Sequence, residues 1–218
     1  MRRQRWAAAL WTGEIIFFVG NVVAQAAWTV PYDPLGYAIS DLGAVTCFTN
    51  VEIGRLICSP AHLIMNLGLI ITGVLMATGA VVFPLARRTR LDRLSRVLLV
   101  IGGLGCALVG LAPEDVAVGP HTVGAVSAMV IGNIGLALFG IALRQHRPAG
   151  GSVAITFAII GLAGVIWLIA LLLSGSPLRY SVGGLAERVA ACSLVIGQVV
   201  VGLTVLMGKS RPSSRIES

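Results

Sequence analysis

Long apolar runs decide what this chain can fold into. Six runs approach the roughly 20 residues that a helix needs to cross a bilayer. They lie near residues 7–29, 61–85, 95–113, 121–143, 152–174 and 187–208. Because lipid offers the backbone no hydrogen-bond partners, only helices and closed barrels span membranes. Continuous rather than alternating runs exclude a barrel. We therefore predict an all-α, single-domain bundle of six transmembrane helices over residues 1–218.

Composition agrees with a membrane protein, since 56% of the residues are hydrophobic and only 11% are charged. A soluble domain needs a more polar surface than this. The net charge of +7 is compatible with nucleic-acid binding, but the placement of the charges argues against it. Basic residues gather in the alternate connections between the runs, which is a topological signal.

If every run crosses the membrane, thirteen of the 16 basic residues fall on one side. These are Arg2, Arg3, Arg5, Arg87, Arg88, Arg90, Arg93, Arg96, Arg144, Arg147, Lys209, Arg211 and Arg215. Arg55, Arg179 and Arg188 fall on the other side. Because basic loops stay in the cytoplasm, we predict a cell-membrane protein with both termini cytoplasmic.

The first outer segment, residues 30–60, is too long for a bare connection, so we expect it to fold over the helix ends. It contains Cys47 and Cys58, which could form a disulfide on an oxidising side or remain free thiols. Residues 209–218 form a polar tail.

Acidic and imidazole groups gather at the outer level. Six of the nine acids lie there: Asp33, Asp41, Glu52, Glu114, Asp115 and Glu187. His62 and His121 begin helices at the same level, and the aromatic residues Trp28, Tyr37 and Tyr180 lie close by in the sequence. Part of this aromatic set is the ordinary belt at a membrane surface.

Three runs also carry polar residues at helical spacing, so that the members of each set share a face. The sets are Glu14, Asn21 and Gln25; His62 and Asn66; and Glu187 and Gln198. Polar groups in hydrocarbon must face protein or water. We therefore predict a common interior cavity that opens toward the outer side.

Each candidate also has a purely structural interpretation. Glu187 could pair with Arg188, and Asp41 could cap a short helix. Asp115 could cap the turn before the fourth run, while His62 and His121 could bond to nearby loops.

From Ser40-Asp41-Leu42-Gly43 onward the chain resembles the bacterial membrane family called domain of unknown function 998. The resemblance continues through Asn66, Pro113, Asp115 and His121 to Glu187-Arg188. It implies a six-span bundle and no particular reaction. It marks as positions of interest Asp41, Asn66, Asp115, His121, Glu187 and Arg188. His62 and Glu14 lie outside the pattern, so their roles rest on spacing alone.

One hypothesis is an intramembrane enzyme that acts on an isoprenoid or lipid-like substrate. A carboxylic acid in an apolar cavity can donate a proton, a histidine can accept one, and aromatic faces stabilise cations. These are the parts of a proton-initiated terpene cyclase. The candidate catalytic residues are Asp41, Asp115, His121, Glu187 and His62, and the candidate substrate-binding residues are Trp28, Tyr37, Asn66, Tyr180 and Arg188.

The alternatives belong to other classes. A metal-dependent lipid hydrolase could use His62, His121 and a carboxylate, but no close histidine pair supports it, so we predict no metal or cofactor. A small transporter or lipid-binding protein would use Glu14, although we find no repeats and expect no broken helices. A structural partner of another membrane protein is the third class. We expect membrane lipid and a hydrophobic small molecule as partners, and the oligomeric state stays open.

Overall fold

The computed structural model describes residues 2–51, 53–84 and 89–207. Within these ranges, six helices are long and apolar enough to cross a membrane, as predicted. They are Arg2–Ala26, His62–Val82, Arg90–Leu111, Val118–Arg144, Pro148–Ser174 and Arg179–Met207. The chain is therefore an all-α, multi-pass membrane protein. Predictions for Glu52, Arg87, Arg88 and residues 209–218 lie outside the described residues.

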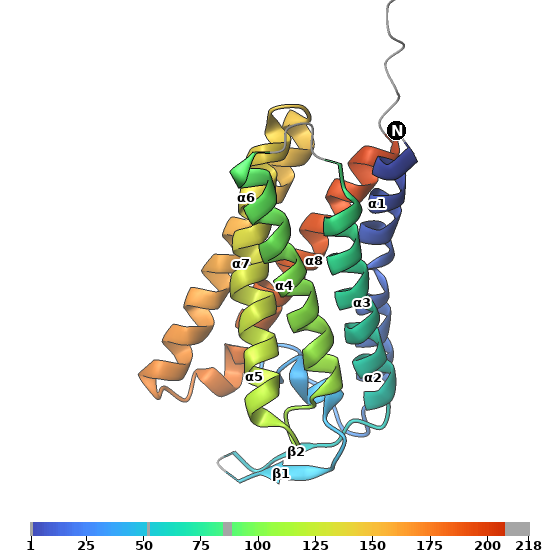
Figure 1. The fold of residues 1–218 in the computed structure, drawn as a ribbon. Coiled ribbons are helices and arrows are strands. Elements are labelled where there is room, and N and C mark those ends of the chain that lie inside the picture. The colour runs from blue at the N-terminus through green and yellow to red at the C-terminus, as the bar shows by residue number, and fades with distance from the viewer. Residues whose placement is uncertain (1, 52, 85–88, 208–218) are drawn as a thin grey trace, which may run out of the picture.

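The helices stand side by side, with a β-hairpin at one end of the bundle and the amino terminus at the other (Figure 1). We call these the hairpin end and the terminal end. Each span packs against the next along the chain. The last helix, α8 (Arg179–Met207), returns to α1 (Arg2–Gly13) and closes the ring.

Two spans are interrupted, although the sequence analysis expected none to be broken. The first consists of α1 and α2 (Ile16–Ala26), separated at Glu14 and Ile15. The fourth consists of α5 (Val118–Val126), a π-helical turn η2 (Ser127–Gly132) and α6 (Asn133–Arg144). The expectation was wrong because no proline marks either break, and π-turns inside helices give no composition signal.

Three other helices are regular: α3 (His62–Val82), α4 (Arg90–Leu111) and α7 (Pro148–Ser174). Helix α4 begins before the predicted residue 95 because Thr89 and Asp92 form a capping box, with reciprocal bonds of 3.1 Å. Helix α8 begins at Arg179 instead of near residue 187, because its polar first turns continue the helix beyond the apolar run.

Small residues and one aromatic cluster hold the ring together. A Cβ on Gly103 of α4 would lie 2.7 Å from the Gly73 carbonyl oxygen of α3, so these backbones meet directly. Toward the terminal end, Trp11, Phe83 and Phe139 are fully buried, with ring centroids 4.9–5.1 Å apart.

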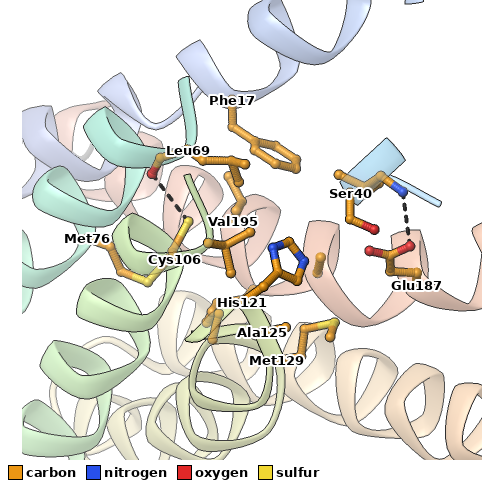
Figure 2. Close-up of a pocket in the computed structure, with 15 residues that line it drawn as sticks. Phe17, Ser40, Leu69, Met76, Cys106, His121, Ala125, Met129, Glu187 and Val195 are labelled. Atoms are coloured by element: carbon orange, nitrogen blue, oxygen red, sulfur yellow. Dashed lines mark hydrogen bonds between the residues drawn. The ribbon is translucent and has the colours of Figure 1, made fainter. Parts of the chain in front are cut away.

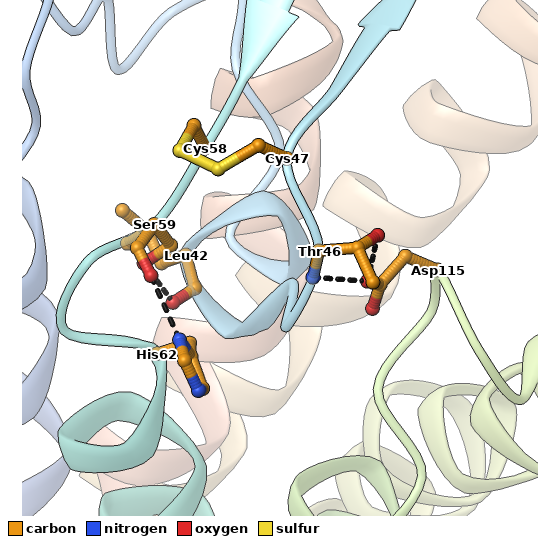
Figure 3. Close-up of a disulfide and its surroundings, with 7 residues drawn as sticks. All are labelled: Leu42, Thr46, Cys47, Cys58, Ser59, His62 and Asp115. Atoms are coloured by element: carbon orange, nitrogen blue, oxygen red, sulfur yellow. Dashed lines mark hydrogen bonds between the residues drawn. A yellow bond between two sulfur atoms is a disulfide. The ribbon is translucent and has the colours of Figure 1, made fainter.

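The segment between the first two spans folds over the hairpin end, as predicted. It contains a short 3₁₀ helix, η1 (Ser40–Gly43), and the strands β1 (Phe48–Asn50) and β2 (Arg55–Ile57). The strands pair antiparallel, with Phe48 opposite Ile57. A disulfide joins Cys47 and Cys58 next to the strands, which settles the alternatives that the sequence left open (Figure 3).

Candidate active site

An apolar cavity lies among the spans in the half of the bundle near the hairpin end. Its volume is about 60 Å³, and its lining comes from α2, η1, α3, α4, α5, η2 and α8. The polar members of the lining are Ser40, Cys106, His121 and Glu187. An interior cavity therefore exists, but of the polar sets predicted to share it only Glu187 lines it. It is also small beside the several hundred Å³ of ordinary ligand pockets.

His121 and Glu187 reach this cavity from different helices. Figure 2 shows the His121 ring directed into the cavity toward Ser40 and Glu187. His121 Nδ1 lies 2.9 Å from the Ala112 carbonyl oxygen. Because a carbonyl only accepts, Nδ1 donates this bond, and Nε2 is not engaged by it.

Glu187 is held by the loop that covers the hairpin end. Its Oε2 accepts a hydrogen bond of 2.9 Å from the backbone N–H of Ile39, just before η1 (Figure 2). This bond connects α8 to a segment 148 residues earlier in the chain. The cavity lining beside Glu187 includes Ile39 and Ser40, so the covering loop forms part of the cavity wall.

A cluster of three carboxyl groups lies beside the cavity. Asp41 hydrogen-bonds to Glu114, and both Glu114 and Glu187 act on Asp41 electrostatically. Burial raises the pKa of Asp41, and repulsion from Glu114 and Glu187 raises it further, against a smaller lowering by the Ala38 N–H. A hydrogen bond between two carboxyl groups requires a proton on one of them, which agrees with the raised pKa of Asp41.

Asp115 does not reach the cavity. Its Oδ2 accepts hydrogen bonds of 2.7 Å from both the backbone N–H and the hydroxyl of Thr46, and Oδ1 accepts one of 3.2 Å from the Val45 N–H (Figure 3). Burial alone would raise the pKa of Asp115, but these hydrogen bonds outweigh it and hold the pKa below its ordinary value. Asp115 tethers the covering loop to the α4–α5 connection.

His62 and Asn66 also hold the loop. His62 Nδ1 lies 2.8 Å from the Ser59 carbonyl oxygen, and the Ser59 hydroxyl donates to Leu42 at 2.7 Å (Figure 3). The Asn66 amide donates to the Gly43 carbonyl at 2.9 Å. The shared helix face predicted for His62 and Asn66 is directed at the loop backbone, and neither residue lines the cavity.

The predicted aromatic and arginine residues form a second loop-holding cluster. Trp28 and Tyr37 pack with Tyr32, at centroid distances of 4.9–5.6 Å. Arg188 donates to the Tyr37 carbonyl at 2.6 Å and to the Tyr32 hydroxyl. The predicted pair of Arg188 with Glu187 is therefore replaced by bonds to the loop, because consecutive helical side chains point apart.

Tyr180 contributes through its backbone. Its carbonyl accepts a 2.9 Å bond from Arg55, whose guanidinium lies 4.3 Å from the Tyr37 ring centroid. Trp28, Tyr37 and Tyr180 do not line the cavity, so this cavity does not bring them to a substrate.

Glu114, Ser40 and Cys106 complete the site and were not among the candidates. The sequence places both Glu114 and Asp115 among the outer acids and favours Asp115 as the candidate. Sequence alone does not say which of the two carboxyl groups faces inward. In the part of the chain that the structure describes, no three His, Cys, Asp or Glu side chains are arranged to hold a metal ion, so the hydrolase hypothesis gains no support.

Comparison with known families shows which family this chain belongs to. The family described as "Protein of unknown function (DUF998)" matches residues 12–204. The chain belongs to the DUF998 family. No curated protein and no solved structure matches it. The DUF998 match covers the four middle spans, the covering loop, part of the first span and nearly all of the last, so the cavity residues lie within the part of the chain that the family shares.

Proposed function

We propose that this DUF998 protein is an intramembrane enzyme that acts on a lipophilic substrate by general acid–base chemistry. The observation that carries the proposal is that His121 and Glu187, from two helices, face one apolar cavity. In this proposal, Glu187 donates a proton to the substrate and His121 Nε2 accepts one. The Asp41–Glu114 pair would restore the proton of Glu187.

The size of the cavity sets the kind of substrate. A volume of about 60 Å³ accommodates the reacting end of a lipid and not a folded polyprenyl chain. The aromatic residues proposed to stabilise a carbocation lie in the covering loop and not in the cavity lining. Both observations favour proton transfer at one end of an isoprenoid or acyl lipid over a complete terpene cyclisation.

The test is turnover by purified protein in lipid nanodiscs, incubated with polyprenyl alcohols, polyprenyl phosphates and phospholipids, with products followed by mass spectrometry. We expect Glu187→Gln and His121→Gln to abolish product formation. Asp33→Asn is the matched control, because Asp33 is an exposed hairpin-end acid away from the cavity. Full turnover in Glu187→Gln, or no turnover of any of these substrates by the wild type, would contradict the proposal.

We also propose that the protein lies in the cell membrane with both termini in the cytoplasm. Arg55, Arg179 and Arg188 are at the hairpin end, whereas the basic connections lie at the terminal end. The Cys47–Cys58 disulfide supports an oxidising environment for the hairpin.

Labelling of intact cells with a membrane-impermeant maleimide tests this orientation. A cysteine at Val51, which is 93% exposed beside the hairpin, should react in intact cells. A cysteine at the exposed Ala149, at the terminal end, should react only after lysis. The opposite result would reverse the orientation.

A further inference from the structure

Three fully buried polar side chains lie in the membrane interior without using their hydrogen-bonding groups. They are Glu14, Thr72 and Gln198, each 0% exposed. Among residues 2–51, 53–84 and 89–207, nothing hydrogen-bonds to either carboxyl oxygen of Glu14, to the Thr72 hydroxyl or to the Gln198 amide. Buried polar groups normally have partners, so three such groups demand an explanation.

Contacts between the helices place Glu14 and Thr72 at one level. The Trp11 indole N–H donates to the Met76 carbonyl at 3.3 Å, which fixes α1 against α3. The two helices run in opposite directions. Glu14 lies one turn beyond Trp11 toward the hairpin end, and Thr72 lies one turn from Met76 in the same direction. The two residues therefore lie at the same depth along the α1–α3 contact.

Gln198 joins this level from α8. A Cβ on Gly202 would lie 2.7 Å from the Ala8 carbonyl oxygen and 2.8 Å from the Thr12 hydroxyl, so Gly202 packs on the last turns of α1. Gln198 is one turn closer to the hairpin end than Gly202, and Glu14 is two residues closer to that end than Thr12. Three spans thus direct a polar group to one depth.

The break in the first span coincides with this level. Glu14 N–H bonds to the Trp11 carbonyl at 3.2 Å, and Phe17 N–H bonds to the Glu14 carbonyl at 3.0 Å. These are tight turns of the 3₁₀ type in place of regular helix. Interrupted helices inside membrane proteins are tolerated where they surround a site or a cavity.

The cavity described above reaches the same helix faces. Phe17, Met76 and Val195, each within one turn of a member of the trio, line it. The trio itself is not part of the lining, but it lies within one turn of residues that line the same cavity as His121 and Glu187.

A carboxylate without an opposite charge beside it is unfavourable at this depth, so we expect the Glu14 carboxyl group to carry a proton. The charged or titratable groups of the helices packed on it include Arg179, Glu187 and Arg188 of α8 and His62 of α3, and these lie in the hairpin-end turns. A metal cation would use oxygen acceptors alone, whereas Gln198 also presents an N–H group. Water, which both donates and accepts, suits this mixture.

We propose that Glu14, Thr72 and Gln198 form a proton-binding site that exchanges protons with the hairpin end through the cavity. The Glu14 carboxyl releases its proton to water, and His121 Nε2 accepts a proton from the resulting hydronium; the reverse steps reload Glu14. A volume of about 60 Å³ holds several waters. The Glu14 site needs no substrate, although its route shares His121 and the cavity with the proposed enzyme chemistry.

Infrared difference spectroscopy of the protein in phosphatidylcholine vesicles tests the site. We expect the wild type to show a carbonyl stretch from protonated Glu14, shifted on transfer to D₂O, beside the bands of other protonated carboxyl groups such as Asp41. The Glu14 band should be lost in Glu14→Gln, kept at a new frequency in Glu14→Asp and unchanged in Glu187→Gln. Because the last variant removes the proposed acid, the two proposals can fail separately.

The route is tested by filling the cavity. Ala125→Leu adds bulk to the lining and should slow the D₂O shift of the Glu14 band, whereas Ala163→Leu, on the exposed face of α7, should not. The absence of a Glu14-dependent band, or a band that does not shift in D₂O, would overturn the site. An unslowed shift in Ala125→Leu would overturn the route through the cavity.

Discussion

Asp115 accepts hydrogen bonds from both the backbone N–H and the hydroxyl of Thr46, each 2.7 Å long. The two residues are 69 positions apart, so this carboxylate joins the covering loop to the connection between α4 and α5. The sequence suggested a catalytic or helix-capping role for Asp115, and the contacts assign it to the loop.

The first prediction concerns this tether. Asp115→Ala leaves two solvent-exposed backbone N–H groups without this acceptor, at a cost of about 0.5–1.5 kcal/mol in loop docking. Hydrogen exchange at Val45 and Thr46 should accelerate accordingly. Thr46→Val, which removes only the hydroxyl bond, should have a smaller effect. Equal exchange in Asp115→Ala and the wild type would show that the tether does not hold the loop.

The same tether should weaken in acid. The pKa of Asp115 is lowered, so its stabilising effect is present above the unfolded pKa of about 3.9 and is lost as the pH falls through the folded pKa. Exchange at Thr46, corrected for the intrinsic pH dependence, should rise at low pH in the wild type. In Asp115→Asn this acid-dependent rise should be absent.

The raised pKa of Asp41 predicts the opposite pH dependence of loop docking. Its pKa is raised from 3.8 to about 8, so the folded state favours the protonated carboxyl. Its contribution to loop docking is fully present below 3.8 and is lost as the pH rises through about 8. Protection of the Ile39 amide should therefore decline toward alkaline pH, and Asp41→Asn should flatten this profile. Protection that rises with pH in the wild type would refute the assignment.

The disulfide gives a further prediction. Cys47 and Cys58 enclose the hairpin at a sequence separation of 11, and closing a loop of this length stabilises by roughly 2–4 kcal/mol. Reduction should expose the β1 and β2 amides to exchange while leaving the six spans protected. Cys47→Ser should reproduce the effect without reductant, whereas substitution of the buried Cys106 by Ser should leave the hairpin unchanged.

Helix packing supplies the last prediction. In Gly103→Ala the new methyl group would press on the α3 backbone at Gly73 and Ala77, at a cost of about 1–3 kcal/mol. Gly183→Ala is the matched control, because nothing lies within 4 Å of its Cβ position. We expect Gly103→Ala to lower the thermal unfolding midpoint and Gly183→Ala to leave it unchanged. Equal midpoints would mean that α3 and α4 can move apart at this contact without a loss of stability.

The six spans could be predicted because the length and continuity of an apolar run are local properties. Their ends could not, since polar turns such as Thr89–Asp92 extend a helix beyond the apolar run. Glu14 could be recognised as buried, but not as the position of a helix break. A carboxyl inside an apolar run is equally consistent with a regular helix.

The candidate site was predicted in part. The level of the acids and histidines along each helix could be inferred from spacing, and His121 and Glu187 do share the cavity. The direction of loop residues could not be inferred, because it depends on tertiary contacts. His62 and Asp115 therefore bond to the loop, while Glu114 joins Asp41.

The bond between Ile39 and Glu187 ties occupancy of the cavity to the position of the covering loop. A guest that takes Glu187 Oε2 for its own hydrogen bond competes with the Ile39 amide for that oxygen. A guest that draws Oε2 away from Ile39 would release this part of the loop, so entry and loop release would be coupled. The mobility of the backbone around Ile39 would then depend on whether the cavity is filled.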